Sequence, residues 1–574
     1  MKKIFSYYKF YKLRLVIIVI MKFIGTALDL VIPFLLSYIL DKVIPTLSKD
    51  NFLPIIWYGL IMIGCSVLAF VLSFKANQLS SYVGCHCAER VRNDLFVRIE
   101  KLSLRQIDEV SMPSLISRIS TDTYNENQFY NILLRLGIRA PVLFFGGIIA
   151  SFILNVRLTL ILLCCIPLIM ILIVLIGKLC FPLLTKTQKA IDDLVRTLRE
   201  DITGIRVIKG LSKEKYENER FAKVNKKVID LELKSGTTMN VLSPSINLIM
   251  NVSLSAVVLV GAILYNRMNN QATSGQIIAF LSYFNIILNS TVQMSRVFIT
   301  YSKASASGER IKYILDLPMD LEKKDSSELS SHFIEFRNVS FSYNGNEMNL
   351  KNINFTLEKN QSLGIIGGTG SGKTTILNLL CRFYDSNKGK VFVNYQDVKT
   401  FDKLTLNCEF GSVFQNDSLF NMSIRDNIKF YRDISEEQIN RALRTSQSDF
   451  VYSLKDQLDS QVEERGNNFS GGQKQRLLIA RSLAGQPKVL IFDDCSSALD
   501  YKTDANMRQA IRKNYPNTTM IVVSQRISSI MNCDKILVID KGQVVDFGTN
   551  EELLERSDIY QEIYASQIGG DYHA

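Results

Sequence analysis

Eight residues in the second half of the chain, 367–374, have the types and the spacing that a phosphate-binding loop needs. They read Gly-Gly-Thr-Gly-Ser-Gly-Lys-Thr and fit the pattern G-x-x-x-x-G-K-[ST]. In such a loop the glycines let backbone N–H groups surround the phosphates of a nucleotide, Lys373 reaches the β- and γ-phosphates, and the Thr374 hydroxyl ligates Mg²⁺. A short apolar strand at 362–366 precedes the loop, and a helix opening at Thr375 follows it, so a helix N-terminus also favours phosphate. The predicted nucleotide-binding residues are Gly367, Gly368, Thr369, Gly370, Ser371, Gly372, Lys373, Thr374 and Thr375.

A second motif, the sequence Ser-Gly-Gly-Gln, begins at Ser470, which lies 103 residues after Gly367. It is followed by Arg476. A Ser-Gly-Gly-Gln-x-x-Arg sequence downstream of a phosphate-binding loop resembles the signature of ATP-binding-cassette (ABC) proteins, and few unrelated chains carry both. The resemblance implies that the nucleotide is ATP and that its metal ion is Mg²⁺.

Length and composition divide the chain into two parts. At 574 residues it is too long for a single domain. Long apolar runs fill residues 1–310, whereas 332–565 has the composition of a soluble α/β domain. The formal net charge of +12 does not indicate a nucleic-acid partner, because the basic residues lie beside the apolar runs, where they act as topology signals. The ten cysteines show no disulfide framework, which suits a reducing cytosol.

Six apolar segments are close to the ~20 residues that a helix needs to cross a bilayer. They lie at 15–43, 54–76, 134–154, 158–180, 241–265 and 276–300. The connection at 181–240 holds thirteen Lys and Arg, whereas the short connections after the first, third and fifth segments hold one each. The positive-inside rule therefore predicts a multi-pass protein of the cell (plasma) membrane, with its N-terminus and its second half in the cytosol.

The long connections keep helical spacing of their apolar residues, so we expect the membrane helices to continue into the cytosol. This layout resembles that of ABC exporters of the multidrug, lipid and peptide group. Residues 115–122 and 200–209 are similar to the two cytoplasmic-loop motifs of that group. The expected fold is an α-helical six-span transmembrane domain at 1–316, a polar linker at 317–331 and an α/β P-loop ABC nucleotide-binding domain at 332–574.

One membrane half and one nucleotide half make a half-transporter, which needs a second half-transporter as partner. In the family, two nucleotide domains pair head to tail, and each signature closes over the γ-phosphate held by the other P-loop. The resemblance implies that Asp500 belongs to the loop that connects the two sites. It also implies that the signature residues act on the ATP of the partner; they are Ser470, Gly471, Gly472 and Gln473.

The resemblance assigns three further residues to the ATP site. Tyr343 matches the aromatic residue that stacks on adenine, although a strand aromatic packed in the core is the alternative. Gln415 matches the glutamine that touches Mg²⁺ and the attacking water. Asp493 ends a buried strand and matches the carboxylate that holds Mg²⁺, which prefers hard oxygen ligands. The implied metal-binding set is Thr374, Gln415 and Asp493.

Two positions depart from the family together. Where the family has a Glu that acts as general base, this chain has Asp494, and where it has a His that contacts the γ-phosphate, this chain has Gln525. Asp is one methylene shorter, which draws the carboxylate back by roughly 1.5 Å, one C–C bond. Gln can donate a hydrogen bond but cannot carry the charge of an imidazolium. This pattern resembles the degenerate-site subunit of a heterodimeric ABC exporter whose partner supplies the Glu and the His. The alternative is that Asp works adequately and both changes are drift.

Two charged residues lie inside the first membrane segment. Lys22 and Asp29 are seven residues apart, and so lie on one face of a helix. Charges at that depth are candidates for function, here contact with the cargo. An ion pair within the bundle or a water-filled cavity are the alternatives.

We expect the chain to be a subunit of an ATP-driven exporter of small amphipathic or drug-like compounds. Its catalytic candidates are Asp494, Gln525 and Gln415, and most hydrolysis is expected at the partner's site. Two alternatives stay open: export of a peptide or a lipid by the same machinery, or a regulatory membrane protein that senses ATP without transport.

Overall fold

The computed structural model describes residues 2–46, 52–267, 273–321, 323–325, 328–345, 347–495 and 498–568. Residues 322, 326 and 327 of the predicted linker therefore lie outside the described part. The chain forms two compact units. The first, the helical unit, comprises Met1–Arg98 and Ile116–Asp316, and the second, the α/β unit, comprises Ile99–Leu115 and Leu317–Ala574.

The helical unit confirms the six membrane spans predicted from the sequence. Within the described ranges, six helices are long and apolar enough to cross a membrane, and the hydropathy of their most apolar windows lies between 1.4 and 3.3. Large apolar side chains such as Trp57, Phe70 and Ile153 point outward and are 61%, 69% and 70% exposed. A bilayer would cover such side chains, so the chain is a multi-pass membrane protein. The spans are Phe5–Thr46, Leu53–Glu100, Met112–Leu154, Val156–Thr203, Glu214–Ile263 and Ser274–Asp316.

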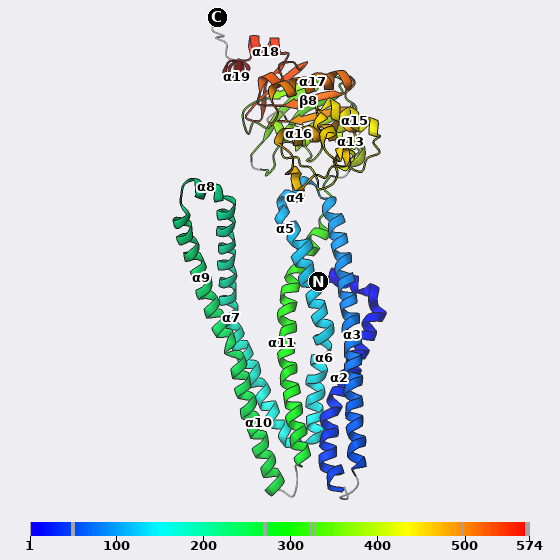
Figure 1. The fold of residues 1–574 in the computed structure, drawn as a ribbon, viewed down its shortest axis with the longest axis vertical. Coiled ribbons are helices and arrows are strands. Elements are labelled where there is room, and N and C mark those ends of the chain that lie inside the picture. Colours follow the sequence, from blue (N-terminus) through cyan, green and yellow to red (C-terminus); the bar gives the residue numbers. More distant parts are fainter. Residues whose placement is uncertain are drawn as a thin grey trace. The chain divides into compact units, whose positions relative to one another are not determined.

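The spans consist of helices that run well beyond their apolar windows (Figure 1). Two of them are interrupted by π-helical turns, η2 at Ile39–Val43 and η4 at Arg118–Asp122. Short helices join or precede the long ones. The helices of this unit are α1 (Lys2–Tyr8), α2 (Lys12–Tyr38), α3 (Leu53–Glu100), α6 (Thr123–Leu154), α7 (Val156–Thr203), α8 (Ile205–Gly210), α9 (Glu214–Asn240), α10 (Leu242–Arg267) and α11 (Ser274–Asp316). The short helix α5 (Met112–Ser117) crosses the division, because its residues up to Leu115 belong to the α/β unit.

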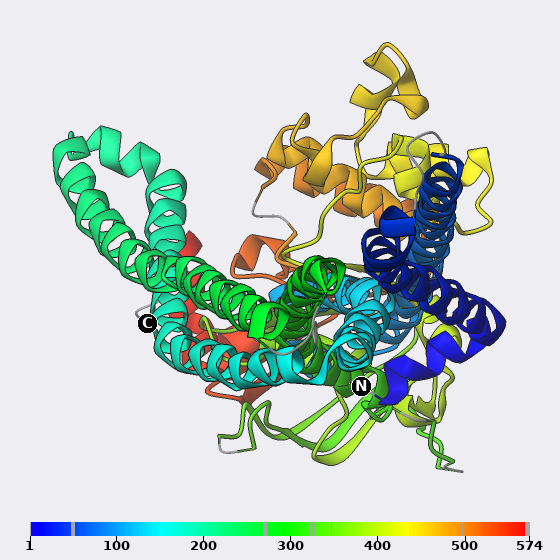
Figure 2. The same cartoon turned by 90° about the horizontal axis from the view of Figure 1, so that it is seen from below.

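Within the helical unit, α7 and α9 form an arm that ends in α8. Figures 1 and 2 show this arm diverging from the group formed by α2, α3, α6 and α11. The base of the arm stays attached through an apolar cluster that includes Ile169 of α7, Val257 of α10 and Phe284 of α11. The group itself is tied by ion pairs, because Arg310 of α11 donates to the buried Asp122 at the start of α6. Within the described part of the helical unit, this apolar cluster anchors the arm at its base.

The α/β unit contains two sheets. The first has four antiparallel strands in the order β2-β1-β4-β5: β2 (Leu350–Leu357), β1 (Ile334–Phe341), β4 (Lys388–Val393) and β5 (Gln396–Asp397). The second has six strands in the order β10-β9-β3-β8-β7-β6: β10 (Gln543–Gly548), β9 (Lys535–Asp540), β3 (Ser362–Ile366), β8 (Thr519–Val523), β7 (Val489–Asp493) and β6 (Phe410–Val413). Its pairs are parallel except for β10 with β9.

The parallel strands are buried on both faces, and for that reason they are continuous apolar runs in the sequence. Along β9, Ile536 and Val538 belong to one apolar cluster, whereas Leu537 and Ile539 belong to the other. This is the alternation that a pleated strand imposes. The helices of the unit are α4 (Leu104–Val110), α12 (Lys373–Leu380), α13 (Lys403–Glu409), α14 (Ile424–Lys429), α15 (Glu436–Thr445), α16 (Gly471–Ala484), α17 (Tyr501–Asn514), α18 (Asn550–Arg556) and α19 (Asp558–Ile568).

The helix α4 packs with the α/β unit although it lies more than two hundred residues earlier in the chain than β1. Ser103 caps it, because the Ser103 hydroxyl accepts from Gln106 N–H and the Gln106 side chain accepts from Ser103 N–H. The side chains of Ser103 and Gln106 also donate hydrogen bonds to the linker. The Gln106 amide donates to the Pro318 carbonyl at 2.7 Å, and the Ser103 hydroxyl donates to Asp320 at 2.7 Å.

Candidate ATP-binding site

Four candidate segments leave the carboxyl ends of neighbouring strands. The loop 367–374 follows β3, Gln525 follows β8, Asp493 ends β7 and Asp494 follows it, and Gln415 follows β6. Because β3, β8, β7 and β6 are adjacent and parallel, these ends share one edge of the sheet. Ligands of open α/β sheets bind at that edge.

The phosphate-binding loop is tightly built. Gly372 has φ +104° and caps α12, which begins at Lys373, two residues earlier than the sequence indicated. A Cβ on Gly367 would lie 2.0 Å from the Ile539 carbonyl oxygen, so only glycine fits there. Nothing lies within 4 Å of a Cβ on Gly368, which faces open space. The loop therefore packs against β9 on one side and is open on the other.

Polar groups of the loop fit a phosphate chain. The Lys373 ammonium folds back and donates to the carbonyls of Gly367 at 2.9 Å and Gly368 at 2.7 Å. Burial lowers the pKa of Lys373, while Asp493 and Asp494 act in the opposite sense. Ser371 is 3% exposed, and its hydroxyl oxygen has no hydrogen-bond partner among the described residues. A phosphate oxygen would satisfy this orphaned donor and recruit the lysine.

Two of the three predicted Mg²⁺ ligands, Thr374 and Asp493, are in direct contact, whereas the place of Gln415 in the set stays a prediction. Thr374 donates a hydrogen bond from Oγ1 to Oδ2 of Asp493 at 3.2 Å, and Asp493 is 3% exposed. Burial raises the pKa of Asp493, the Thr374 bond lowers it and neighbouring Asp494 raises it. A buried carboxylate beside a hydroxyl is a donor pair that suits Mg²⁺, with the remaining positions left for phosphate oxygens and water. Within the described ranges, no group of three or more His, Cys, Asp or Glu side chains is arranged to hold a metal ion.

Asp494 directly follows Asp493, the predicted Mg²⁺ ligand, and has a strained backbone. Its φ is +53°, in the left-handed region that non-glycine residues avoid, and its N–H donates to the Val523 carbonyl at 2.9 Å. Burial raises the pKa of Asp494, and Arg526 and Lys373 oppose that shift. Strain of this kind persists where the surroundings fix the backbone, which here are β8 and the segment that follows it.

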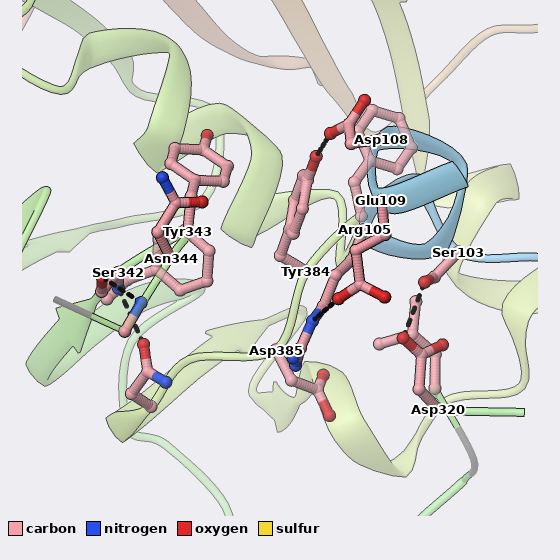
Figure 3. Close-up of a pocket in the computed structure, with 15 residues that line it drawn as sticks. Ser103, Arg105, Asp108, Glu109, Asp320, Ser342, Tyr343, Asn344, Tyr384 and Asp385 are labelled. Atoms are coloured by element: carbon pink, nitrogen blue, oxygen red, sulfur yellow. Dashed lines mark hydrogen bonds and ion pairs between the residues drawn. The ribbon is translucent and has the colours of Figure 1, made fainter. Parts of the chain in front are cut away.

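The predicted adenine residue Tyr343 is half-buried at the end of β1 (Figure 3). Its hydroxyl donates to Thr375 at 3.3 Å and accepts from Asn378 at 3.1 Å. The ring meets Tyr384 edge to face, with centroids 5.0 Å apart and an interplanar angle of 89°. The edge of the Tyr343 ring is therefore packed, as the alternative reading expects, and stacking on adenine stays a prediction.

Tyr384 connects Tyr343 to α4, because it contacts both Tyr343 and Asp108. Its hydroxyl donates to the Asp108 carboxylate at 2.5 Å, and burial together with this bond raises the pKa of Tyr384. Figure 3 shows Tyr384 between Tyr343 and the helix that carries Asp108. The three residues border a polar cavity of about 640 Å³. Its acidic side chains are partnered inside the unit, for example Glu109 with Arg105 and Asp320 with Ser103.

The signature residues begin α16. The Ser470 hydroxyl accepts from Gln473 N–H at 3.3 Å, and the Gln473 side chain accepts from Ser470 N–H at 3.0 Å. Gly472 lies against the segment before Asp500, since a Cβ there would be 3.2 Å from the Ala498 carbonyl. Asp500 caps α17 by accepting from Thr503 N–H at 2.9 Å. Among the described residues, no hydrogen bond or ion pair joins residues 470–473 to the loop 367–375.

Comparison with known proteins gives the same division of the chain. Residues 15–291 match the ABC transporter transmembrane region, and residues 350–497 match the ABC transporter family. The ABC transporter ATP-binding protein exp8 of Streptococcus pneumoniae is 30% identical over 99% of this chain and 97% of its own length. The chain belongs to the ABC transporter family. YfiB, an ABC transporter ATP-binding protein of Bacillus subtilis, is 31% identical over 99% of both chains.

A solved structure shares the fold of this ABC transporter. A bacterial Atm1-family ABC exporter with ATP bound superposes with a TM-score of 0.81, covering 98% of this chain and 99% of the other. The identity is 24%, so the likeness concerns the fold. The predicted fold class, six membrane helices followed by an α/β ABC domain, is confirmed.

In this ABC transporter the two membrane charges have partners inside the helical unit. Lys22 is 3% exposed and donates to the Asn77 side chain at 2.8 Å. Asp29 accepts from Arg139 of α6 at 3.0 Å, and its side chain is 29% exposed. The sequence analysis named Lys22 and Asp29 together, but the structure gives each its own partner on a different helix.

Sequence reasoning missed several residues that contact the site. Tyr384 and Asp108 form the link between Tyr343 and α4, and Arg526 acts on Asp494. Gln567, on the C-terminal helix α19, hydrogen-bonds the backbone on both sides of Arg526. Arg526 directly follows Gln525 in the sequence, whereas Tyr384, Asp108 and Gln567 belong to no motif with fixed spacing. The helical spacing of Tyr560, Ile563 and Gln567 offered a weak signal.

Proposed function

We propose that this chain is one half of an ATP-driven exporter in the cell membrane, with its N-terminus and its α/β unit in the cytosol. The observation that carries the proposal is the meeting of Thr374, Asp493 and the phosphate-binding loop at one sheet edge in a chain with six membrane spans. The cargo we propose is a small amphipathic or drug-like compound. The exposed part of Asp29 is the place in the first span where such a cargo would meet a charge.

The chain acts as part of a dimer. A complete ATP site needs a signature over the γ-phosphate, and the chain's own signature has no bond to its own loop in the described ranges. The arm also ends in exposed apolar side chains, with Val207 63% and Leu211 64% exposed. The α/β unit in turn exposes aromatic side chains downstream of Gln415, with Phe420 47% and Tyr431 93% exposed. Such surfaces are suited to being covered by a second half-transporter.

Within the ATP site, each residue has one task. The loop 367–375 binds the phosphates, Tyr343 holds the base, and Gln415 orients the attacking water. Asp494 accepts the proton of that water, and Gln525 donates a hydrogen bond to the γ-phosphate. Mg²⁺, when bound to Thr374 and Asp493, neutralises charge that develops on the phosphates. Ser470 and its glycines do the corresponding work at the partner's site.

The chain's own site binds ATP but hydrolyses it slowly. A base must reach its proton, and a misplacement of ~1 Å can cost ~10²-fold in rate. Asp494 is short by one C–C bond, and Gln525 lacks the charge of an imidazolium. We therefore propose a heterodimer in which the partner supplies a Glu and a His.

Two experiments test this function. The purified chain, without a partner, is expected to bind ATP and to turn it over well below the usual enzyme range of ~1–10 s⁻¹. A rate within that range would refute the proposal that this chain's own site hydrolyses ATP slowly.

In the second experiment, inside-out vesicles that contain the assembled transporter are expected to accumulate an amphipathic dye when ATP is added. Accumulation of a lipid or a peptide but not of a dye would favour the alternative cargoes, and ATP binding without any accumulation would favour a sensor.

A further inference from the structure

The C-terminal helix α19 is firmly attached to the α/β unit. Tyr560 is fully buried, belongs to the main apolar cluster and donates from its hydroxyl to Asn550 of α18 at 2.7 Å. Ile563 packs against the same cluster. Gln567 follows at the i+7 position from Tyr560, so the same helix face carries it two turns further on. The buried anchor therefore fixes where the Gln567 amide lies.

The Gln567 amide binds the segment that contains Gln525. Its Oε1 accepts from Ile527 N–H at 2.8 Å, and its Nε2 donates to the Gln525 carbonyl at 2.7 Å. One side chain thus uses both ends of its amide to bridge two backbone groups that flank Arg526. This is the pairing that a neighbouring strand would supply, and it is provided by a residue 42 positions later in the chain than Gln525.

The other side of the segment is held by the sheet. Ser524 N–H donates to the Ile365 carbonyl of β3 at 3.2 Å, and Arg526 N–H donates to the Ser524 hydroxyl at 3.0 Å. Gln525 itself is exposed at the end of β8. The direction of its side chain therefore depends on two anchors, the end of β3 and the amide of Gln567. Arg526, which acts on Asp494, lies between the same two anchors.

We propose that Gln567 is a positioning residue that orients the switch segment, Gln525 and Arg526, toward the γ-phosphate. It touches neither ATP nor Mg²⁺. Its contribution is geometric: it keeps the Gln525 side chain and the Arg526 charge at the catalytic edge of the sheet. The C-terminal helix is thereby a control point for turnover, because displacing α19 would release the switch segment while leaving the phosphate-binding loop in place. The inference rests on the proposed ATP hydrolysis at this site.

The test compares three variants of the full chain, each assembled in lipid nanodiscs with a partner whose catalytic Glu is replaced by Gln, using radiolabelled ATP. Gln567→Leu keeps the size of the side chain and removes both hydrogen bonds. Gln567→Glu keeps the acceptor for Ile527 N–H and loses the donor to the Gln525 carbonyl. Gln561→Leu is the matched control: Gln561 is also on α19, but its amide donates to the Leu554 carbonyl of α18 at 2.6 Å and does not reach the switch segment.

A positioning role predicts that Gln567→Leu lowers kcat by about tenfold while the KM for ATP stays within about twofold, a split that loss of two neutral hydrogen bonds can produce. Gln567→Glu should fall between that variant and the wild type, and Gln561→Leu should match the wild type. An unchanged kcat in Gln567→Leu, or an equal loss in Gln561→Leu, would overturn the proposal. The ratio of each variant's kcat to that of the wild type tests the positioning role, even if the wild-type rate is low. A chain that binds no ATP would instead refute the proposed function.

Discussion

The ATP site has two sides that leave adjacent strands of one sheet yet differ in composition. The side proposed to hold phosphate and Mg²⁺, after β3 and at the end of β7, keeps the residues expected in an ABC transporter, and its packing tolerates only glycine at position 367. The side proposed to activate water and to contact the γ-phosphate carries Asp494 and Gln525 instead of the usual Glu and His. The proposed binding and turnover roles thus fall on different residues, although Asp493 and Asp494 are neighbours at the end of the same strand, β7.

The largest expected effect is the difference in total ATPase activity between a substitution of Ser470 in the signature and a substitution of the base Asp494. In the transporter assembled with its native partner, Ser470→Ala should lower total ATPase activity by ~10²–10³-fold, the scale for removing a donor aimed at developing negative charge. Asp494→Asn should change it little, because Asp494 serves the weak site. The measurement is steady-state phosphate release. If Asp494→Asn abolishes the activity and Ser470→Ala preserves it, the assignment of the two sites is wrong.

A smaller effect probes the phosphate-holding side. Gly367→Ala would place a Cβ 2.0 Å from the Ile539 carbonyl oxygen and should weaken ATP binding by about 10- to 100-fold, the cost of overpacking a rigid contact. Gly368→Ala is the matched control, since nothing lies within 4 Å of that Cβ. Equilibrium binding of a fluorescent ATP analogue measures both. Equal affinities in the two variants would show that the loop does not have the packing described.

The third effect is a gain on the water-activating side. Asp494→Glu combined with Gln525→His should raise hydrolysis at this chain's site by about tenfold, less than the ~10²–10⁴-fold that a general base can contribute. The partner's signature, which must close over this ATP, limits the gain. The partner's catalytic Glu is replaced by Gln so that only this site is measured. No gain under those conditions would place the block outside these two residues.

The smallest effect concerns the link from the ATP site to α4. Tyr384→Phe removes the hydrogen bond to Asp108 and should lower transport per ATP hydrolysed by about threefold, with ATP binding unchanged. Tyr452→Phe removes a hydroxyl bond to Asn440 at 2.7 Å elsewhere in the same unit and should leave the ratio alone. Dye accumulation and phosphate release are measured in the same vesicles. A loss of equal size in both variants would point to general destabilisation.

The sequence by itself determined those features whose chemistry is written in short, contiguous stretches. The phosphate-binding loop, the signature and the six spans depend on residue types at fixed spacing, because backbone N–H groups, a helix N-terminus and a bilayer each impose a local length. The pairing of Thr374 with Asp493 was also accessible, since a buried apolar strand ending in a carboxylate places it at the carboxyl edge of the sheet. The departures at Asp494 and Gln525 were visible for the same reason.

Only the tertiary structure decided which distant residues support the site. Tyr384 meets Asp108 across 276 positions, Asp29 meets Arg139 across 110, and Gln567 meets Gln525 across 42. No periodicity encodes such pairs, because they arise from how α4, α6 and α19 pack against their units. The sequence also placed Lys22 and Asp29 on one helix face, but it could not show that Asn77 and Arg139 on other helices satisfy them. Packing chooses partners by proximity in space, and spacing along the chain reports proximity only within one helix or one strand.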